Sequence, residues 1–234
     1  MGERGSQSGR RVAVIGASGR MGTATVQAVQ AEPTLELVAC VGSNDDLGAF
    51  LESSQADVAI DFTTPERVAS HLRLLIERRI HPIIGTTGLT PAELDESVRA
   101  SAEAGLGGLV APNFSIGAVL MMEFAERAAR FLPEAEVIEY HHPNKIDAPS
   151  GTALRTQERM QAAGLESCPI HSVRLSSYLA HQEVILARGG ERLIIRHDTS
   201  DRACFMPGVL LAIRAVPHFR TLEVGLERAL ELDL

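Results

Sequence analysis

The sequence predicts a two-domain α/β protein, in which a doubly wound parallel sheet is followed by a smaller α+β domain on a mixed or antiparallel sheet. Three observations lead to this prediction. A glycine-rich turn follows the first apolar segment, and apolar segments then alternate with helical patterns over roughly the first 130 residues. After about residue 134, the apolar segments instead follow one another as paired strands.

The first unit reads as a strand, a glycine turn and a helix. Its sequence, RVAVIGASGRMG, contains Gly16, Gly19 and Gly22, and the helical pattern runs through Met21 and Ala24. Glycines let the backbone turn tightly and approach a pyrophosphate, and the free N–H groups of a helix start bind its charge. The unit is typical of a Rossmann-like dinucleotide site, although the same glycines also suit an ordinary tight turn with close helix packing.

The next units repeat the order of strand and helix. ADVAIDFTTPERVASHLRLLI reads as a buried strand and a helix with Thr64 as N-cap and Pro65 at its first position. HPIIGTTGLTPAELDESV follows the same logic, with Thr90 and Glu93 in a capping box, and GGLVAPNFSIGAVLMMEFAERAARFL gives a fourth strand and a long helix. The loops DFTTPE, GTTGL and APNFS then all follow carboxyl ends of parallel strands, where such sheets bind ligands.

The second half is predicted to hold a different sheet. EAEVIEYHH, HQEVILA and RLIIRHD read as strands, the last two joined across RGGE as a hairpin. A helix is expected to start at Ser150 and to end near Gly164, and Pro207 opens another through GVLLAIRAV. The predicted domains are residues 1–113, to which residues 207–234 return, and residues 114–206.

Composition narrows the classes of function. A formal charge of -8 and a pI near 5.5 disfavour a broad basic face for nucleic acid. Cys40, Cys168 and Cys204 are scattered and lack CxxC spacing, which disfavours disulfides or zinc and favours a reducing cytoplasm. No apolar run reaches the length of a membrane span, and the polar start MGERGSQSGR is expected to be a disordered tail. We therefore expect neither a nucleic-acid nor a membrane partner.

Residues 139–154, EYHHPNKIDAPSGTAL, concentrate reactive side chains. The Ser-Gly-Thr step at 150–152 reads as a helix start that can hold an anion such as a carboxylate. Beside it, His141, His142 and Lys145 could hold a second carboxylate or donate a proton. A metal site is disfavoured, because adjacent strand residues point to opposite faces and nothing completes a ligand set. A purely structural role, with the histidines at a strand end and the lysine solvated, stays open.

Together, VIGASGRMG, DFTTPE, GTTGL, APNFSIG and EYHHPNKIDAPSGTA resemble the dihydrodipicolinate reductases, also called 4-hydroxy-tetrahydrodipicolinate reductases, of the bacterial and plant lysine pathway. The likeness covers most of the chain and continues into IHSVR and FMPGVLLAIRAV. It implies NADPH- or NADH-dependent reduction of a cyclic imine, in the diaminopimelate route, by a cytoplasmic homotetramer. Residues 1–113 would bind the dinucleotide, and residues 114–206 would bind a small dicarboxylate substrate and form the tetramer contacts.

The resemblance also assigns roles to single residues. His141 would be the catalytic proton donor and Lys145 its catalytic partner at the substrate. The cofactor-binding residues would be Gly16, Ala17, Ser18, Gly19, Arg20, Met21, Gly22, Gly85, Thr86, Thr87, Ala111, Pro112, Asn113 and Phe114. The substrate-binding residues would be Thr87, His142, Lys145, Ser150, Gly151 and Thr152, and no metal is implied.

Two departures from the family pattern limit what the resemblance implies. Family members often carry an acidic residue after the second strand, whereas ELVACVGSNDD offers Gly42, Ser43 and Asn44, which leaves the choice between NADH and NADPH open. The segment between the helix that starts at the Ser-Gly-Thr step and IHSVR is short, so a surface helix of the second domain is expected to be shorter than in the family. Two other functions compete with the reductase: another imine or amino-acid dehydrogenase such as an aspartate dehydrogenase, and a non-catalytic dinucleotide-sensing module.

Overall fold

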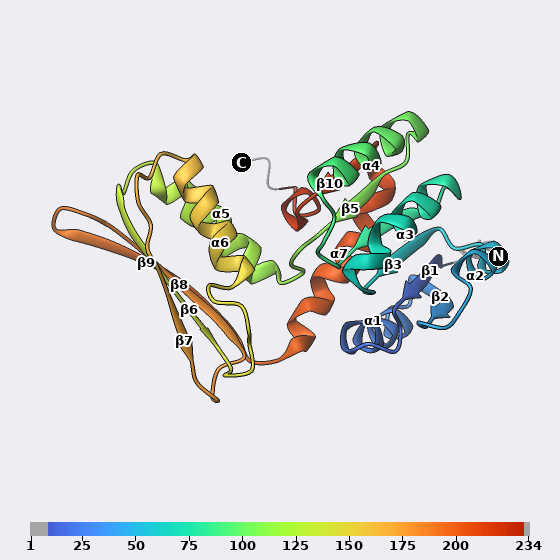
Figure 1. Cartoon of the computed structure of the whole chain (residues 1–234), viewed down its shortest axis with the longest axis horizontal. Coiled ribbons are helices and arrows are strands. Elements are labelled where there is room, and N and C mark those ends of the chain that lie inside the picture. The colour runs from blue at the N-terminus through green and yellow to red at the C-terminus, as the bar shows by residue number, and fades with distance from the viewer. Residues whose placement is uncertain (1–8, 232–234) are drawn as a thin grey trace, which may run out of the picture. The chain divides into compact units, whose positions relative to one another are not determined.

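The computed structural model describes residues 9–231, so residues 1–8 of the expected N-terminal tail lie outside the described part. The chain forms two compact units, which are coloured along the sequence in Figure 1. One contains the N-terminal residues through Phe114 together with the segment from Phe205 onward, and the other is Ser115–Cys204. None of the described helices is long and apolar enough to cross a membrane.

The first unit is built on a six-stranded sheet with the order β10-β5-β4-β3-β1-β2, in which all pairings are parallel. Its strands are β1 (Arg10–Ile15), β2 (Leu35–Val41), β3 (Val58–Asp61), β4 (His81–Ile84), β5 (Gly108–Val110) and β10 (Leu222–Val224). Its α-helices are α1 (Arg20–Ala31), α2 (Leu47–Ser54), α3 (Pro65–Glu77), α4 (Pro91–Ala104) and α7 (Met206–Ala215). This confirms the Rossmann-like doubly wound fold, because the strand order reverses direction between β1 and β3.

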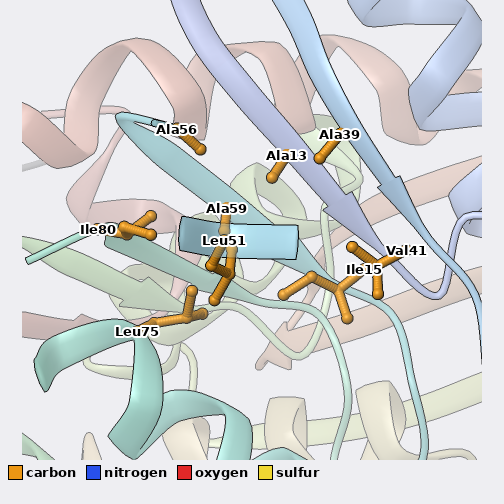
Figure 2. Close-up of a cluster of buried hydrophobic side chains, with 9 residues drawn as sticks. All are labelled: Ala13, Ile15, Ala39, Val41, Leu51, Ala56, Ala59, Leu75 and Ile80. Carbon is orange, nitrogen blue, oxygen red and sulfur yellow. The ribbon is translucent and has the colours of Figure 1, made fainter. Parts of the chain in front are cut away.

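The apolar strand segments form the core of this sheet. Residues 12–15 of β1 are all fully or almost fully buried, as expected for a central parallel strand covered on both faces. One core cluster joins β1, β2 and β3 to α2 and α3 (Figure 2), and consists of Ala13, Ile15, Ala39, Val41, Leu51, Ala56, Ala59, Leu75 and Ile80. A second cluster contains Val68, Leu72 and Ile76 of α3, Ile84, Leu106 and Leu222. The buried apolar residues of α3 are therefore divided between two parts of the core.

The helix starts follow the sequence closely, with one difference in detail. The predicted capping box at α4 is confirmed, because Thr90 accepts from the Glu93 N–H and Glu93 in turn accepts from the Thr90 N–H. Thr64 and Pro65 stand where predicted at the start of α3, but the Thr64 hydroxyl makes no capping hydrogen bond.

Strand β10 was not predicted, because three residues are too few to show the alternation of apolar and polar residues that indicates a strand.

The second unit has a four-stranded mixed sheet with the order β7-β6-β8-β9, as predicted in kind. Its strands are β6 (Glu134–His141), β7 (Ile170–Arg174), β8 (Ala180–Arg188) and β9 (Glu191–Thr199), with β6 and β7 parallel and the other pairs antiparallel. The helices α5 (Ile116–Ala129) and α6 (Gly151–Ala162) pack on each other and on the sheet, as Figure 1 also shows. The predicted hairpin is β8 and β9, and α6 starts at the predicted cap. Short 3-10 helices at Arg202–Phe205, Val216–His218 and Leu226–Arg228 complete the described chain.

Candidate active site

The glycine turn lies at the point where the strand order reverses. Gly16 follows β1 with φ of +77°, and its N–H and that of Ala17 donate to the carbonyl of Val41 at the end of β2. A Cβ on Gly16 would lie 2.8 Å from the carbonyl oxygen of Phe62, which follows β3. Only glycine suits both the left-handed backbone and this close approach of two loops.

The start of α1 has the properties of an anion site. Gly19 is its N-cap and provides no side-chain hydrogen bond, so the first N–H groups of the helix lack a side-chain acceptor. A Cβ on Gly22 would lie 2.1 Å from the carbonyl oxygen of Gly16, which explains how the helix approaches the turn so closely. Ser18 and Arg20 are exposed beside this helix start. These residues fit a dinucleotide pyrophosphate, because both the N–H groups and the helix dipole favour a negative group there.

A chain of hydrogen bonds organises the loops after β3 and β4. The fully buried carboxylate of Asp61 accepts from the N–H and the hydroxyl of Thr63, and its other oxygen lies 2.7 Å from Nδ1 of His71. The hydroxyl of Thr86 then donates to the carbonyl of Thr63 at 3.2 Å. Asp61 and His71 were not among the predicted site residues. A carboxylate at the end of a buried strand was the sequence signal that could have identified Asp61.

An aromatic wall stands beside these loops. The rings of Phe62 and Phe114 meet edge to face with centroids 5.6 Å apart, and a Cβ on Gly85 would collide with both rings. Ala111 is buried and Pro112 is exposed. The predicted cofactor residues after β1, β4 and β5 therefore gather at one edge of the sheet, because all these strands are parallel. Phe62, which sequence reasoning missed, joins them there.

A cation on α3 that sequence reasoning also missed reaches the loop after β2. Arg67 on α3 donates from Nη1 to the carbonyl of Ser43 at 3.0 Å, and Asp45 accepts from the Gly42 N–H at 2.7 Å. In doubly wound folds, this loop is where a dinucleotide ribose is read. Because Asp45 is already engaged in shaping the turn, a guanidinium close to the loop favours a phosphate there.

In the second unit, a buried carboxylate holds His141. Glu139 and His141 lie two residues apart on β6, so their side chains leave the same face of the sheet. Nδ1 of His141 lies 2.5 Å from Oε2 of Glu139, and Arg174 on β7 donates to both oxygens of Glu139 at 2.9 and 2.7 Å. Arg174 also donates to the carbonyl of Asp147 and so fixes the loop after β6.

Burial and the neighbouring charges together set the protonation of His141. Burial lowers the pKa of His141, the carboxylate of Glu139 opposes that effect, and Lys145 and Arg174 lower the pKa further. The pKa of Glu139 is also held below its usual value: burial would raise it, but hydrogen bonds from Arg174, Ser172 and His141 outweigh that effect. The imidazole is therefore poised in its neutral form at neutral pH.

Lys145 lies in the loop between β6 and α6. It is the only lysine in the 234 residues, whereas the other 21 of the 22 lysine and arginine residues are arginine. Its ammonium donates to both oxygens of Asp147 at 2.8 Å, and Asp147 is exposed. An ion pair with an exposed partner is easily exchanged, so Lys145 is available to a carboxylate from solution.

The helix start at α6 completes this group. The hydroxyl of Ser150 caps α6 by accepting from the Ala153 N–H, and Ser150 itself is buried. Gly151 is exposed, and a Cβ added there would meet no heavy atom within 4 Å. Packing therefore gives no reason for a glycine at this position, whereas close approach of an anion to the helix start does.

The predicted site residues thus fall into two sets, one in each unit. The first set contains the turn after β1 and the loops after β4 and β5. Thr87 is exposed in the loop after β4. The second gathers His141, Lys145 and the helix start at 150–152, with His142 following directly after β6. No group of three or more metal-ligating side chains was found among residues 9–231.

Comparisons with known proteins match both units of the chain to the same family. A family model described as the N-terminus of dihydrodipicolinate reductase matches residues 10–114, and one described as its C-terminus matches residues 117–229. The 4-hydroxy-tetrahydrodipicolinate reductase of Nocardia farcinica is 47% identical over 247 residues, covering 95% of this chain and 99% of the relative. That of Streptomyces coelicolor is 45% identical, covering 95% and 98%. Among solved structures, dipicolinate-bound dihydrodipicolinate reductase from Paenisporosarcina sp. TG-14 matches with a TM-score of 0.87 at 35% identity, covering 94% of this chain and 98% of that one.

Proposed function

We infer that this chain, which belongs to the dihydrodipicolinate reductase family, is a 4-hydroxy-tetrahydrodipicolinate reductase. It reduces 4-hydroxy-tetrahydrodipicolinate to tetrahydrodipicolinate with NADPH or NADH, in the diaminopimelate route of lysine biosynthesis. The observation that carries the inference is the group in the second unit: an imidazole held by Glu139, the only lysine of the chain, and a helix start left open at Gly151.

We assign the first unit to the dinucleotide. The start of α1 would hold the pyrophosphate through its N–H groups, and the glycine turn allows the close approach that this requires. Gly85, Phe62 and Phe114 would shape an apolar surface for the nicotinamide ring. A bound reduced nicotinamide supplies the two electrons and the hydrogen that reach carbon, and the chain supplies orientation.

We assign the second unit to the substrate, a small dicarboxylate. Lys145 would exchange Asp147 for one substrate carboxylate, and the helix start at 150–152 would hold the other. His141 would donate a proton from Nε2, since Nδ1 faces Glu139. The lowered pKa of His141 describes the protein alone, and two substrate carboxylates would favour the charged imidazole by adding negative charge nearby.

We further propose that the protein acts as a homotetramer in the cytoplasm. Support for assembly comes from the family resemblance and from exposed apolar side chains on the sheet of the second unit, such as Leu193 and Ile194 on β9. The free thiols of Cys40, Cys168 and Cys204 suit a reducing compartment. Light scattering of the purified protein tests the tetramer, and a monomer at micromolar concentration would contradict it.

A coupled assay that generates the imine in situ tests the function. The parent protein should oxidise NADPH or NADH only when the imine is formed. Lys145→Met should raise the Michaelis constant for the imine by roughly 10- to 140-fold, the loss of one charge-assisted hydrogen bond of about 1.5–3 kcal/mol. His141→Gln should instead lower kcat by on the order of a hundredfold or more. Turnover of aspartate but not of the imine would indicate an amino-acid dehydrogenase, and tight dinucleotide binding without turnover would indicate a sensing module.

The single lysine provides a check on the site that is independent of turnover. Apart from the α-amino group, Lys145 is the only amine that an amine-selective reagent can modify. A planar pyridine dicarboxylate added with the dinucleotide should slow modification of Lys145 without slowing that of the α-amino group. Equal protection of both amines would contradict the assignment of Lys145 to the substrate.

A further inference from the structure

We propose that Glu139 and Arg174 are positioning residues of this reaction: Glu139 fixes the orientation and tautomer of His141, and Arg174 fixes Glu139 and the loop that carries Lys145. The proposal rests on the proposed function, because it gives these residues a role through His141. It comes from a geometry that joins three elements, β6, β7 and the loop between β6 and α6, at one carboxylate.

The sheet register brings the three side chains together. Glu139 is fully buried on the face of β6 that packs under the helices, and His141 follows on the same face at the end of the strand. Arg174 stands directly beside His141 in the parallel pairing of β6 with β7. Its two Nη atoms reach the two carboxylate oxygens of Glu139, the forked geometry that fixes a carboxylate in direction as well as in place.

This arrangement decides which nitrogen of His141 faces the substrate. An ionised carboxylate can only accept hydrogen bonds, so Nδ1 of His141 must carry a hydrogen toward Glu139. Nε2 is then the nitrogen left to exchange a proton. Without the carboxylate, the neutral ring would choose between two tautomers and two flipped orientations, and only one of these four arrangements serves proton transfer.

Arg174 has a second consequence, which reaches Lys145. Its Nη2 also donates to the carbonyl of Asp147 at 2.9 Å, and Asp147 is the residue that pairs with Lys145. Arg174 therefore helps to fix the positions of both His141, through Glu139, and Lys145, through the loop that contains Asp147. Fixed positions matter because small displacements of catalytic groups lower the rate substantially.

Stability alone is a weak explanation for the pair. A buried ion pair contributes on average no more to stability than apolar packing of similar volume, because both charges lose their water. The pairing is also imperfect, since Nε of Arg174 is buried without a hydrogen-bond partner among the described residues. A residue kept for packing would not need a charge that costs this much to bury.

The test is a pH titration of His141 by NMR, in which His141→Gln identifies its signal among the eight histidines. The charged groups that face the ring are Glu139 from β6, Arg174 from β7, and Lys145 and Asp147 from the loop. Glu139→Gln removes the negative neighbour and should lower the pKa of His141 by about one to three pH units. Arg174→Met should raise it, because the carboxylate then acts on the imidazole alone.

Arg174→Met leaves the buried carboxylate of Glu139 without its partner and could prevent folding. The double variant Glu139→Gln/Arg174→Met removes both charges and can be titrated in that case. With both charges removed, the pKa of His141 should lie between those of Glu139→Gln and the parent. Asp198→Asn is the matched control, because Asp198 forms a similar pair with His181 on the same unit, at 2.6 Å. That variant should leave the titration of His141 and the kcat at their parent values.

Activity gives the second readout. The pH profile of kcat should move in the same order as the titrations, with kcat of Glu139→Gln reduced at least tenfold and the Michaelis constant for NADPH unchanged. Glu139→Asp, which keeps the charge, should restore part of kcat. A folded Glu139→Gln variant with the parent titration and parent kcat would overturn the proposal. Absence of imine reduction by the parent would instead overturn the proposed function, and the NMR order would still show whether Glu139 and Arg174 set the state of His141.

Discussion

Replacing Gly151 by alanine should separate ligand binding from folding. A Cβ at this position meets no heavy atom within 4 Å, and the backbone of Gly151 is not left-handed. Alanine is favoured over glycine by about 1 kcal/mol in a helix interior, and Gly151 is the first residue of α6. The free energy of unfolding of Gly151→Ala should therefore stay at the parent value or rise by less than about 1 kcal/mol.

The same methyl group should weaken the binding of a dicarboxylate. Gly151 is exposed at the helix start where we place a substrate carboxylate, so a Cβ would hold that carboxylate away from the first N–H groups of α6. Loss of one charge-assisted hydrogen bond costs about 1.5–3 kcal/mol. At about 1.4 kcal/mol per tenfold, the affinity should fall roughly 10- to 140-fold.

Calorimetric titration of pyridine-2,6-dicarboxylate, with NADPH present, measures this change. Gly190→Ala is the matched control, because Gly190 lies in the turn between β8 and β9 and a Cβ there also meets no heavy atom within 4 Å. Thermal unfolding of both variants should match the parent. If Gly151→Ala binds the dicarboxylate as tightly as the parent and the control, the start of α6 does not hold a carboxylate and our assignment is wrong.

Three further changes test other parts of the site. Gly22→Ala places a Cβ 2.1 Å from the backbone oxygen of Gly16, so denaturant titration should show a loss of about 1–3 kcal/mol, and parent stability would contradict the close approach. Asp147→Asn frees Lys145 from its ion pair and should tighten dicarboxylate binding several-fold in calorimetry, whereas weaker binding would mean that Asp147 orients the lysine. Arg67→Met should lower the ratio of kcat/KM for NADPH over NADH by roughly tenfold, and an unchanged ratio would remove Arg67 from cofactor selection.

Features determined by neighbouring residues could be predicted from the sequence. The capping box at Thr90 and Glu93, the cap at Ser150 and the glycine turn after β1 each depend on residues within a few positions of one another. The antiparallel part of the second sheet was also predicted by the hairpin pattern of β8 and β9. These signals are strong because local backbone conformation and hydrogen bonding already favour the observed structure in each segment.

Features that depend on distant residues were missed. Strand β7 pairs in parallel with β6 only after the chain has passed through α6, and its Arg174 meets Glu139 across 35 positions. Asp61 at the end of β3 pairs with His71 on α3, ten positions later, and no sequence motif connects these two residues. The spacing of Glu139 and His141 was nevertheless readable, because residues two apart on a strand share a face. A carboxylate two residues before a candidate proton donor on a strand therefore predicts that the two side chains can meet.

The distribution of lysine and arginine explains why the two cations of the second unit differ. The chain has 21 arginines and one lysine. Arg174 binds the buried carboxylate of Glu139 with its rigid, planar guanidinium, and this carboxylate is a permanent partner. Lys145 pairs with an exposed carboxylate through a compact ammonium that can turn to a new partner without keeping a planar geometry. A substrate carboxylate that must enter and depart during each turnover needs the second kind of cation. Lys145→Arg should therefore fail to restore the parent Michaelis constant even though it keeps the charge, and full restoration would show that charge alone is required.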